Sequence, residues 1–255
     1  MKVTLIAHTP QPEMVAASAA KLCYSSSGID EITEGLDEEK TASYIDMLAS
    51  LGHESVMEHA SFTFGIEGIS RACSHQLVRH RIASYSQKSQ RYVNEDGFDF
   101  VTPPSVSDIP QAQQEYNRII DEISKSYTII ADMLAEKHRA DFISQGMDEK
   151  TAASKARKLA NEDARFILPN ACETKIIVTM NVRSLFNFFR HRCCNRAQWE
   201  IRAVADEMLK LCIQTAPNIF RHAGPSCVAG GKCPEGKMSC GKILQVKEKY
   251  NKFFI

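Results

Sequence analysis

One long amphipathic stretch limits the folds that this chain can adopt. Its apolar residues recur at helical spacing over five turns, at Tyr116, Ile119, Ile120, Ile123, Tyr127, Ile130 and Leu134. Such a stripe must pack against another element, so it predicts a long helix in a helix-rich protein. The chain has 255 residues, of which 44% are hydrophobic, which is enough for one large domain or two small ones with a buried core.

Periodicity and capping residues predict further elements around this helix. The helices are expected at residues 12–22, 38–51, 70–80, 148–167, 182–192 and 197–212. Phe62, Phe64 and Ile66 alternate with small or polar residues, which predicts a strand over 61–66. Residues 175–180 and the first ten residues also have strand character. The pattern predicts a helix-dominated α+β single domain with a small antiparallel or mixed sheet.

Charge is segregated along the chain, although 31 basic residues balance 31 acidic ones. The windows 68–94 and 174–199 contain no Asp or Glu, and they hold these ten basic residues: Arg71, Arg79, Arg81, Lys88, Arg91, Lys175, Arg183, Arg190, Arg192 and Arg196. Two such windows predict segments that converge on an anion, and the planar guanidinium fork matches phosphate oxygens. The alternative is that distant acids pair with these side chains in the fold.

The densest basic segment is residues 79–92, which packs four Lys or Arg residues, three serines and two amides into fourteen positions. A helix that ends near His80, followed by a Ser- and Gln-rich loop, would present N–H groups and hydroxyls beside guanidinium groups. That combination suits a nucleotide phosphate and the polar edge of a base. A solvated basic loop, or one that touches a nucleic-acid backbone, is the alternative.

This segment resembles the signature of the flavin-dependent thymidylate synthase family. Arg-His-Arg at 79–81 is followed at the family's spacing by Ser84, Ser89 and the pair Arg91-Tyr92. Flanking segments are similar over about residues 53–201, namely His53-Glu54-Ser55, Glu58-His59, Ser70-Arg71, Gln76, Ala164-Arg165, Leu168-Pro169, residues 181–188, Arg192 and residues 197–201. The resemblance implies a catalytic domain over residues 1–220, followed by a Gly- and Cys-rich tail over 221–255.

The resemblance also implies the reaction and the assembly. Members of the family convert dUMP to dTMP, with 5,10-methylenetetrahydrofolate as carbon donor and tetrahydrofolate as product. Reduced FAD donates the hydride, and NADPH reduces the flavin. The family forms homotetramers whose sites lie between subunits. The sequence shows no signal peptide and no apolar stretch near the ~20 residues of a membrane span, so we expect a cytoplasmic enzyme with neither membrane nor nucleic-acid partners.

Site residues are carried over by position. The dUMP contacts implied by the resemblance are Gln76, Arg79, Gln87, Lys88, Ser89, Gln90, Arg91, Arg165 and Arg192, with Arg165 reaching in from a neighbouring subunit. The FAD contacts implied are Ser55, Glu58, Arg79, His80, Arg81, Asn181, Arg183, Asn187 and Arg196. His53 is assigned to the region shared by folate and flavin.

Three residues are expected to carry the chemistry. Arg91 and Arg192 are placed in the resemblance to stabilise negative charge that develops on the uracil ring, and Arg192 is expected to have the largest effect. Ser89 is expected to align or polarise dUMP by hydrogen bonding, because no base that would make it a nucleophile lies beside it in sequence. His80 is expected to be neutral, because flanking arginines disfavour its protonation.

The sequence departs from the commonest family pattern at two places. Ser86-Gln87 stands where many members have Asn-Glu, which argues against a carboxylate general base at this position. Arg196 stands where histidine is common, which weakens the transfer of its role at the flavin. Other classes are a nucleic-acid-binding protein, which sparse aromatic residues and zero net charge disfavour, and a flavin-binding protein without uracil chemistry.

Metal ligation is not expected anywhere in the chain. His53 and His59 are six residues apart, a spacing that does not bring two ligands to one ion on a helix or a strand. The tail holds Cys227, Cys233 and Cys240, which with His222 would supply four ligands. Zinc motifs usually contain tighter cysteine pairs, so free thiols are favoured there over a structural metal or a disulfide.

Overall fold

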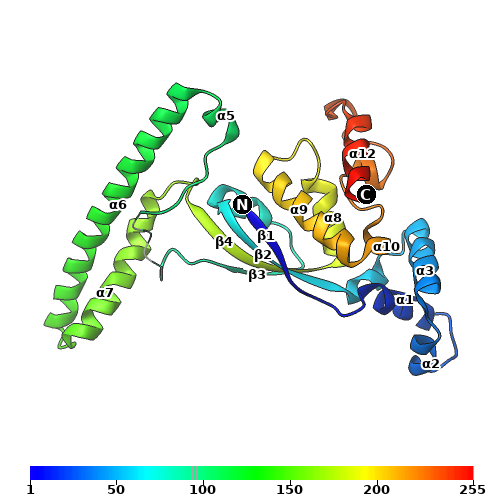
Figure 1. The fold of residues 1–255 in the computed structure, drawn as a ribbon. Helices are drawn as coiled ribbons and strands as arrows, with labels where there is room; N and C mark the ends of the chain where they lie inside the picture. The colour runs from blue at the N-terminus through cyan, green and yellow to red at the C-terminus, as the bar shows by residue number, and fades with distance from the viewer. Residues whose placement is uncertain (94, 96, 255) are drawn as a thin grey trace. The chain divides into compact units, whose positions relative to one another are not determined.

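The computed structural model describes residues 1–93, 95 and 97–254 (Figure 1). The chain divides into two compact units. Unit 1 comprises residues 1–67, 75–86 and those from 176 onward, whereas unit 2 comprises residues 68–74 and 87–175. Among the described residues, no helix is both long enough and apolar enough to cross a bilayer.

The helices and strands follow one another in the order that Figure 1 labels. Unit 1 contains β1 (Lys2–His8), α1 (Pro12–Leu22), α2 (Ile29–Glu34), α3 (Glu38–Leu51), the 3-10 helix η1 (Ser55–His59), α8 (Val182–Arg192), α9 (Trp199–Thr215), α10 (Pro217–Phe220), α11 (Ser226–Ala229), η3 (Gly236–Met238), α12 (Ile243–Asn251) and η4 (Lys252–Phe254). Unit 2 contains α5 (Pro104–Ser107), α6 (Pro110–Ser144), α7 (Glu149–Ala164) and η2 (Arg165–Ile167). The division falls within β2 (Ser61–Ser70), α4 (Arg71–Leu77), β3 (Ala83–Gln87) and β4 (Glu173–Asn181).

A four-stranded sheet has the order β1-β2-β4-β3. β1 and β2 are antiparallel, with Lys2 opposite Glu67 and Leu5 opposite Phe64. β2 and β4 also run in opposite directions, because the Thr63 hydroxyl lies 2.9 Å from that of Thr179 while the Val182 amide, further along the chain, donates to the Ala60 carbonyl. The expectation of a helix-dominated α+β chain with a small sheet is therefore confirmed.

The core of unit 1 is formed by apolar faces that the sequence pattern predicts. Phe62, Phe64 and Ile66 of β2 are fully buried, as their alternation indicated. α8 buries Leu185, Phe188 and Phe189, and α9 buries the face predicted for residues 197–212. Phe220 of α10 packs edge-on against Phe62 with ring centroids 5.5 Å apart. These contacts hold α8 and α9 in fixed positions within unit 1.

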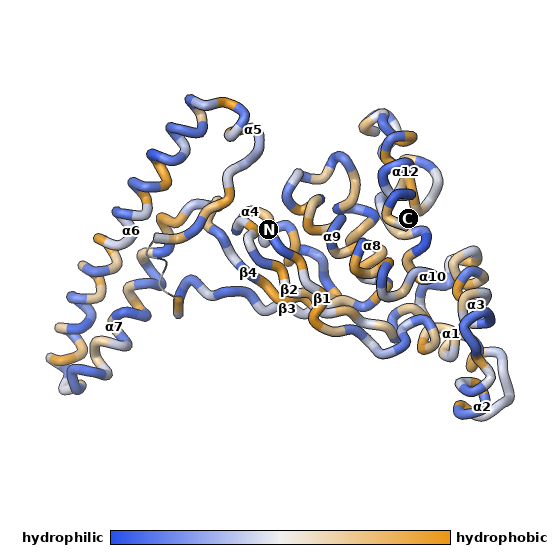
Figure 2. Tube along the Cα trace, in the orientation of Figure 1, coloured by the Kyte–Doolittle hydropathy of each residue, from blue (hydrophilic) through white to orange (hydrophobic). Residues whose placement is uncertain are grey.

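Unit 2 is built on a pair of long helices. α6 extends the predicted amphipathic helix to 35 residues, and apolar and polar positions alternate along it in Figure 2. α7 buries an alanine every fourth residue, at Ala152, Ala156, Ala160 and Ala164. Alanines at this spacing form one smooth stripe that lets two helices approach closely. Tyr127 and Ala131 of α6 pack against Ala164 in this interface.

Several bounds differ from the prediction, and residues 70–87 differ most. A single helix was expected over 70–80, but β2 continues to Ser70 and α4 ends at Leu77. The Ser70 hydroxyl nevertheless accepts a hydrogen bond from the Cys73 amide at 3.0 Å, as the predicted cap does. The expected loop after His80 contains the strand β3, because the edge of β4 offers it backbone partners that local sequence does not reveal.

The described residues after 220 pack onto the rest of unit 1. α11 contacts α8, and η4 contacts α9. Tyr250 of α12 is almost fully buried, and its hydroxyl donates to the Asp206 carboxylate at 2.5 Å and lies 2.8 Å from the Cys193 carbonyl. Asp206 is also buried and pairs with Lys249. These polar contacts anchor α12 to α9 and to the end of α8.

Removing the Tyr250 hydroxyl tests this anchor. Tyr250→Phe leaves a buried carboxylate oxygen and a buried carbonyl short of a partner, so the free energy of unfolding should fall by about 1–3 kcal/mol. Urea denaturation of the full chain measures the change. Tyr24→Phe is the matched control, since Tyr24 is 86% exposed and should leave stability unchanged. If both variants were equally stable, the Tyr250 hydroxyl would not be what anchors α12.

Candidate functional site

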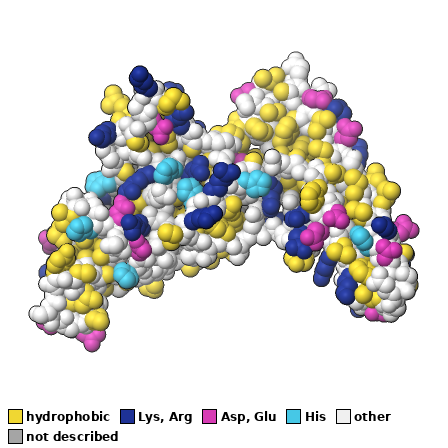
Figure 3. Space-filling view, turned by 180° about the vertical axis from the view of Figure 1, so that it is seen from behind, with side chains coloured by type: hydrophobic (Ala, Val, Ile, Leu, Met, Phe, Trp, Pro, Cys, Tyr) yellow, Lys and Arg dark blue, Asp and Glu magenta, His cyan; other side chains and the backbone are white. Residues whose placement is uncertain are grey.

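Unit 1 contains a cavity of about 480 Å3 with a strongly basic lining. We call it the basic pocket and define it by Arg79, His80, Arg81, Asn187, Arg190, His191, Arg192 and Arg196. Further lining comes from Cys194 and Ala197 and from the tail, at Pro225, Ser226, Cys227, Cys233, Pro234 and Glu235. Figure 3 shows Lys and Arg side chains beside histidines on one face of the molecule.

Helix α8 positions one wall of the basic pocket. The Asn181 side chain caps the helix by accepting from the Ser184 amide at 2.8 Å. Its apolar face is buried, so the opposite side chains project from a fixed helix. The last turn carries Arg190, His191 and Arg192, and cations there are favoured by the negative end of the helix dipole.

His80 is held neutral by its surroundings. Arg192 Nε donates to His80 Nε2 at 2.8 Å, so this ring nitrogen is an acceptor and carries no proton. Burial lowers the pKa of His80 to about 4, with further contributions from Arg192 and His191. The predicted direction is confirmed, but the cause is different, because burial and Arg192 take the place of the flanking arginines.

Other residues assigned to FAD lie around α8 and η1. Arg183 donates to Glu58 at 2.5 Å, which joins the first turn of α8 to η1. Arg196 donates to the Met238 carbonyl of the tail. Asn181 is engaged as the helix cap, and Ser55 is the first residue of η1. The structure thus brings Arg79, His80, Arg81, Asn187 and Arg196 into one pocket, and Ser55, Glu58, Asn181 and Arg183 are outside its lining.

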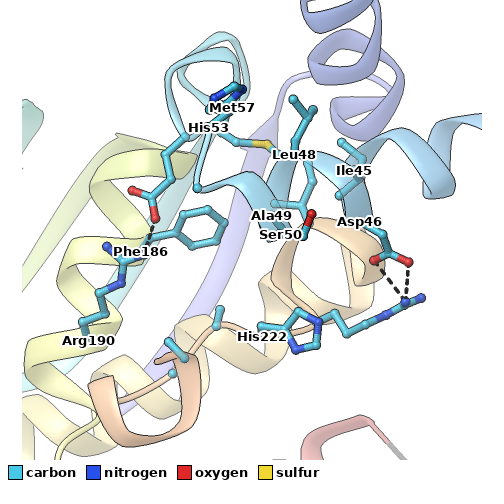
Figure 4. A pocket seen from close by; sticks show the side chains of 17 residues that line it. Ile45, Asp46, Leu48, Ala49, Ser50, His53, Met57, Phe186, Arg190 and His222 are labelled. Carbon is cyan, nitrogen blue, oxygen red and sulfur yellow. Dashed lines mark hydrogen bonds and ion pairs between the residues drawn. The ribbon is translucent and has the colours of Figure 1, made fainter. Parts of the chain in front are cut away.

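His53 lies in a second cavity of unit 1, of about 370 Å3. Figure 4 shows this cavity between α3, η1 and α8, with Met57, Phe186 and His222 in its lining. Arg190 lines both cavities and pairs with Glu54. His53 is therefore separated from the basic pocket by the side chain of Arg190 in the lining that the two cavities share.

In unit 2, the residues assigned to dUMP are tied to their own unit. Gln87 Nε2 donates to the hydroxyls of Ser74 and Thr174 at 2.9 and 3.2 Å. Lys88 pairs at 2.9 Å with Glu95, whose side chain is only 2% exposed. Gln90 Nε2 lies 3.5 Å from Cys172 Sγ. These hydrogen bonds and this ion pair fix the orientation of residues 87–90.

Arg91 and Arg165 contact Glu162 near the end of α7, and Ser89 contacts Arg91. Arg91 pairs with the Glu162 carboxylate at 2.7 Å, and Arg165 Nε donates to the Glu162 carbonyl at 3.1 Å. The Ser89 hydroxyl accepts from the Arg91 amide at 3.2 Å. The two arginines therefore share one acidic residue, and Ser89 takes part in the turn that presents Arg91. Gln76 lies in α4 in unit 1.

Distant acids pair with part of the basic windows. Lys88, Arg91, Arg183 and Arg190 form ion pairs with Glu95, Glu162, Glu58 and Glu54 respectively. Pairing with acids in the fold, the alternative to anion binding, therefore occurs for four of the ten basic residues in the two windows. The basic pocket nevertheless combines four arginines outside those pairs, Arg79, Arg81, Arg192 and Arg196, with one lining acid, Glu235.

The sequence reasoning missed several residues that line the basic pocket. Arg190 and His191 stand in an acid-free window, and their place in the last turn of a basic helix was the available signal. Glu235 and Ser226 come from the tail, and neither spacing nor composition indicated that the tail reaches this pocket.

Comparison with known proteins identifies the family. A family described as Thymidylate synthase complementing protein matches residues 4–218. The flavin-dependent thymidylate synthase of Clostridium tetani (strain Massachusetts / E88) is 54% identical over 250 residues, which cover 98% of this chain and 97% of the relative. The chain belongs to the flavin-dependent thymidylate synthase family. It is accordingly an enzyme of dTMP biosynthesis that depends on a flavin.

Other members of the family extend the likeness. The flavin-dependent thymidylate synthase of Geobacter sulfurreducens (strain ATCC 51573 / DSM 12127 / PCA) is 52% identical over 257 residues and covers both chains completely. That of Pyrococcus abyssi (strain GE5 / Orsay) is 38% identical and covers 99% of this chain and 97% of its own. The alignment with the Geobacter relative therefore includes the tail beyond residue 218, where the family match ends.

Acid should destabilise the fold through His80. Unfolded His80 takes up a proton near pH 6.5, whereas the folded form resists protonation down to about pH 4. Stability from this group is therefore complete above pH 6.5 and is lost as the pH falls through this window. His80→Gln keeps an acceptor but cannot titrate, so its Tm should fall less than that of the wild type between about pH 7 and about pH 5.

Differential scanning calorimetry at both pH values measures this difference. His8→Gln, at the exposed end of β1, is the matched control and should lose as much Tm as the wild type. An equal loss in His80→Gln and the wild type would show that His80 does not carry the acid sensitivity.

Proposed function

We propose that this enzyme converts dUMP to dTMP with 5,10-methylenetetrahydrofolate as carbon donor, FAD as the flavin, NADPH as its reductant and tetrahydrofolate as product. The basic pocket, with its neutral histidine, is the observation that carries the proposal. Family membership supports the reaction class. The reaction must join a carbon to an unactivated position of uracil and then reduce it to a methyl group.

The donor set of the basic pocket fits FAD. Arginine forks at Arg79, Arg81 and Arg196 match the oxygens of a diphosphate, and the Asn187 amide offers both a donor and an acceptor. A volume of about 480 Å3 lies in the range of small-ligand pockets. Ser55, Glu58, Asn181 and Arg183 complete the proposed flavin set, and His53 is proposed for folate. Reduced flavin supplies the hydride when bound.

The segment 87–91 is proposed to bind dUMP together with Gln76, Arg79, Arg165 and Arg192. Arg91, which the Glu162 carboxylate holds, presents one guanidinium group to the phosphate, and Arg165, whose Nε donates to the Glu162 carbonyl, presents a second to the site of a neighbouring subunit. Ser89 donates a hydrogen bond that orients the uracil. The side chain of residue 87 is an amide, so it orients the base and does not remove a proton from it.

Arg192 is proposed to stabilise the negative charge that develops on the uracil ring. Its Nε donates to the neutral His80 ring, and this bond fixes the direction of the guanidinium group at the wall of the basic pocket. A guanidinium group fixed in this way needs no reorganisation when charge appears, which is the condition for strong electrostatic catalysis. Arg91 is proposed to assist at the same ring.

We further propose that the enzyme is a homotetramer in which a neighbouring subunit supplies Arg165 to each dUMP site. The support is family resemblance together with the position of Arg165 at the exposed end of α7, beside Phe166, which is 82% exposed. An apolar ring as exposed as this favours a surface that another subunit covers.

Replacing Arg192 tests its role directly. Arg192→Ala should lower turnover by at least about 100-fold, the loss typical of removing one oxyanion-stabilising donor, while flavin binding changes little. Arg192→Lys keeps the charge but not the planar fork and should recover only part of the activity. Arg118→Ala, which removes a surface ion pair on α6, is the matched control and should remain fully active. Near-normal turnover of Arg192→Ala would remove Arg192 from the chemistry.

Release of tritium from dUMP labelled at ring carbon 5 tests the reaction itself. The assay uses purified protein with methylenetetrahydrofolate and NADPH, with and without added FAD. Flavin-dependent release together with dTMP formation is expected. Absence of release from a protein that binds and reduces flavin would contradict the proposal and would favour a flavoprotein without uracil chemistry.

A further inference from the structure

Four cysteines that the flavin chemistry does not use gather in unit 1. Cys194 follows α8, Cys227 lies in α11, Cys233 precedes Pro234, and Cys240 follows η3. The first three line the tail side of the basic pocket. Cys240 Sγ lies 4.0 Å from Nδ2 of Asn195, the residue next to Cys194. All four are free thiols.

The four thiols share one locality, because three of them line one cavity and Cys240 contacts the residue next to Cys194. His222, the fourth ligand considered from the sequence, lines the second cavity with His53 instead. The residue that lies with the tail cysteines is therefore Cys194 and not His222. Cys194 is outside the tail, and its spacing from the tail cysteines matches no known motif.

We propose that Cys194, Cys227, Cys233 and Cys240 bind one zinc ion as thiolates. Four cysteine ligands form a closed tetrahedral set of the kind found in structural zinc sites, with no position left for substrate. Soft thiolates select zinc over magnesium or calcium. The proposal is independent of the flavin assignment, and it replaces the expectation of free thiols in the tail.

Neighbouring arginines favour this site electrostatically. Zinc with four thiolates carries a net charge of −2, which would be costly in an apolar region. Arg192 and Arg196 line the same cavity as three of the cysteines and offset that charge.

Binding requires the four sulfurs to draw together. Within the described chain, no group of three or more His, Cys, Asp or Glu side chains already has the arrangement of a metal site. Cys233 and Cys240 lie outside regular elements, beside Gly231 and Gly241, which have φ values of 73° and 69°. Loops of this kind change conformation at a low cost in free energy. The free energy of metal binding would offset the entropy lost when they become ordered.

The zinc would clamp the tail to the turn between α8 and α9. Arg196 of that turn donates to the Met238 carbonyl, between Cys233 and Cys240 in sequence. Arg202 of α9 donates to the Asn195 carbonyl at 3.0 Å, which braces the same turn. Because the turn follows Arg192 directly, the clamp would fix the C-terminal end of α8. It is a structural role, since all four coordination positions are occupied by protein.

Metal analysis of the full-length protein tests the site. After dialysis against metal-free buffer, mass spectrometry of the elements should find one zinc ion per chain. Cys233→Ser and Cys240→Ser should each lose at least about nine-tenths of that zinc, because three thiolates do not close the site. Cys23→Ser, at an exposed position in unit 1, is the matched control and should keep the full amount.

Cobalt substitution gives a second readout that does not depend on activity or on how the variants fold. Cobalt(II) bound to the wild-type chain should show the intense visible bands of tetrahedral coordination and a sulfur-to-metal charge-transfer band in the near ultraviolet. Absence of zinc together with a cobalt spectrum that lacks these bands would overturn the site. Stoichiometric iron with inorganic sulfide, or a thiol titration two short of nine, would overturn it in favour of a cluster or a disulfide.

Discussion

The hydrogen bond from Arg192 to His80, together with the burial of the ring, keeps this histidine neutral inside the basic pocket. Five arginines, Arg79, Arg81, Arg190, Arg192 and Arg196, line one cavity, and a further cation among them would raise the electrostatic energy of the folded chain. His80 avoids this cost by staying neutral, and its unprotonated Nε2 becomes the acceptor that Arg192 needs. The bond thus orients a guanidinium group without neutralising it, which an acidic partner could not do.

Helix α8 transmits this constraint to the rest of unit 1. Its buried phenylalanines fix its position, and His80 packs edge-on against Phe188 with ring centroids 4.9 Å apart. Two ion pairs connect its exposed side to the region of η1. Arg183 pairs with Glu58 of η1, and Arg190 pairs with Glu54, the residue before η1. Such half-exposed ion pairs add little stability individually. Their effect is to set the direction of side chains that surround the two cavities.

Local pattern predicted the elements better than it predicted their partners. α1 and α3 begin and end at the predicted bounds, residues 12–22 and 38–51, since caps and periodicity act within a few residues. β3 was missed because residues 83–87 become a strand only beside β4. The signature contains Arg79, His80 and Arg81 of the basic pocket, and the flanking resemblance adds Asn187, Arg192 and Arg196. Nothing in the sequence indicated that the tail also lines the pocket. Contacts between Cys194 and residues 227–240 depend on tertiary packing that no local spacing encodes.

The ion pairs of the basic segment in unit 2 distinguish two residues, Lys88 and Arg91, that the resemblance assigns alike to dUMP. Glu95 is buried and forms an ion pair with Lys88, so withdrawing Lys88 toward a substrate would leave a carboxylate away from water without this partner. The Arg91–Glu162 pair is different, because the two side chains are 44% and 34% exposed and water can solvate Glu162 when Arg91 leaves. An incoming phosphate therefore recruits Arg91 at a lower cost than Lys88. By this reasoning Lys88 holds the segment in shape, and Arg91 is the cation within it that is poised to exchange an internal partner for a ligand.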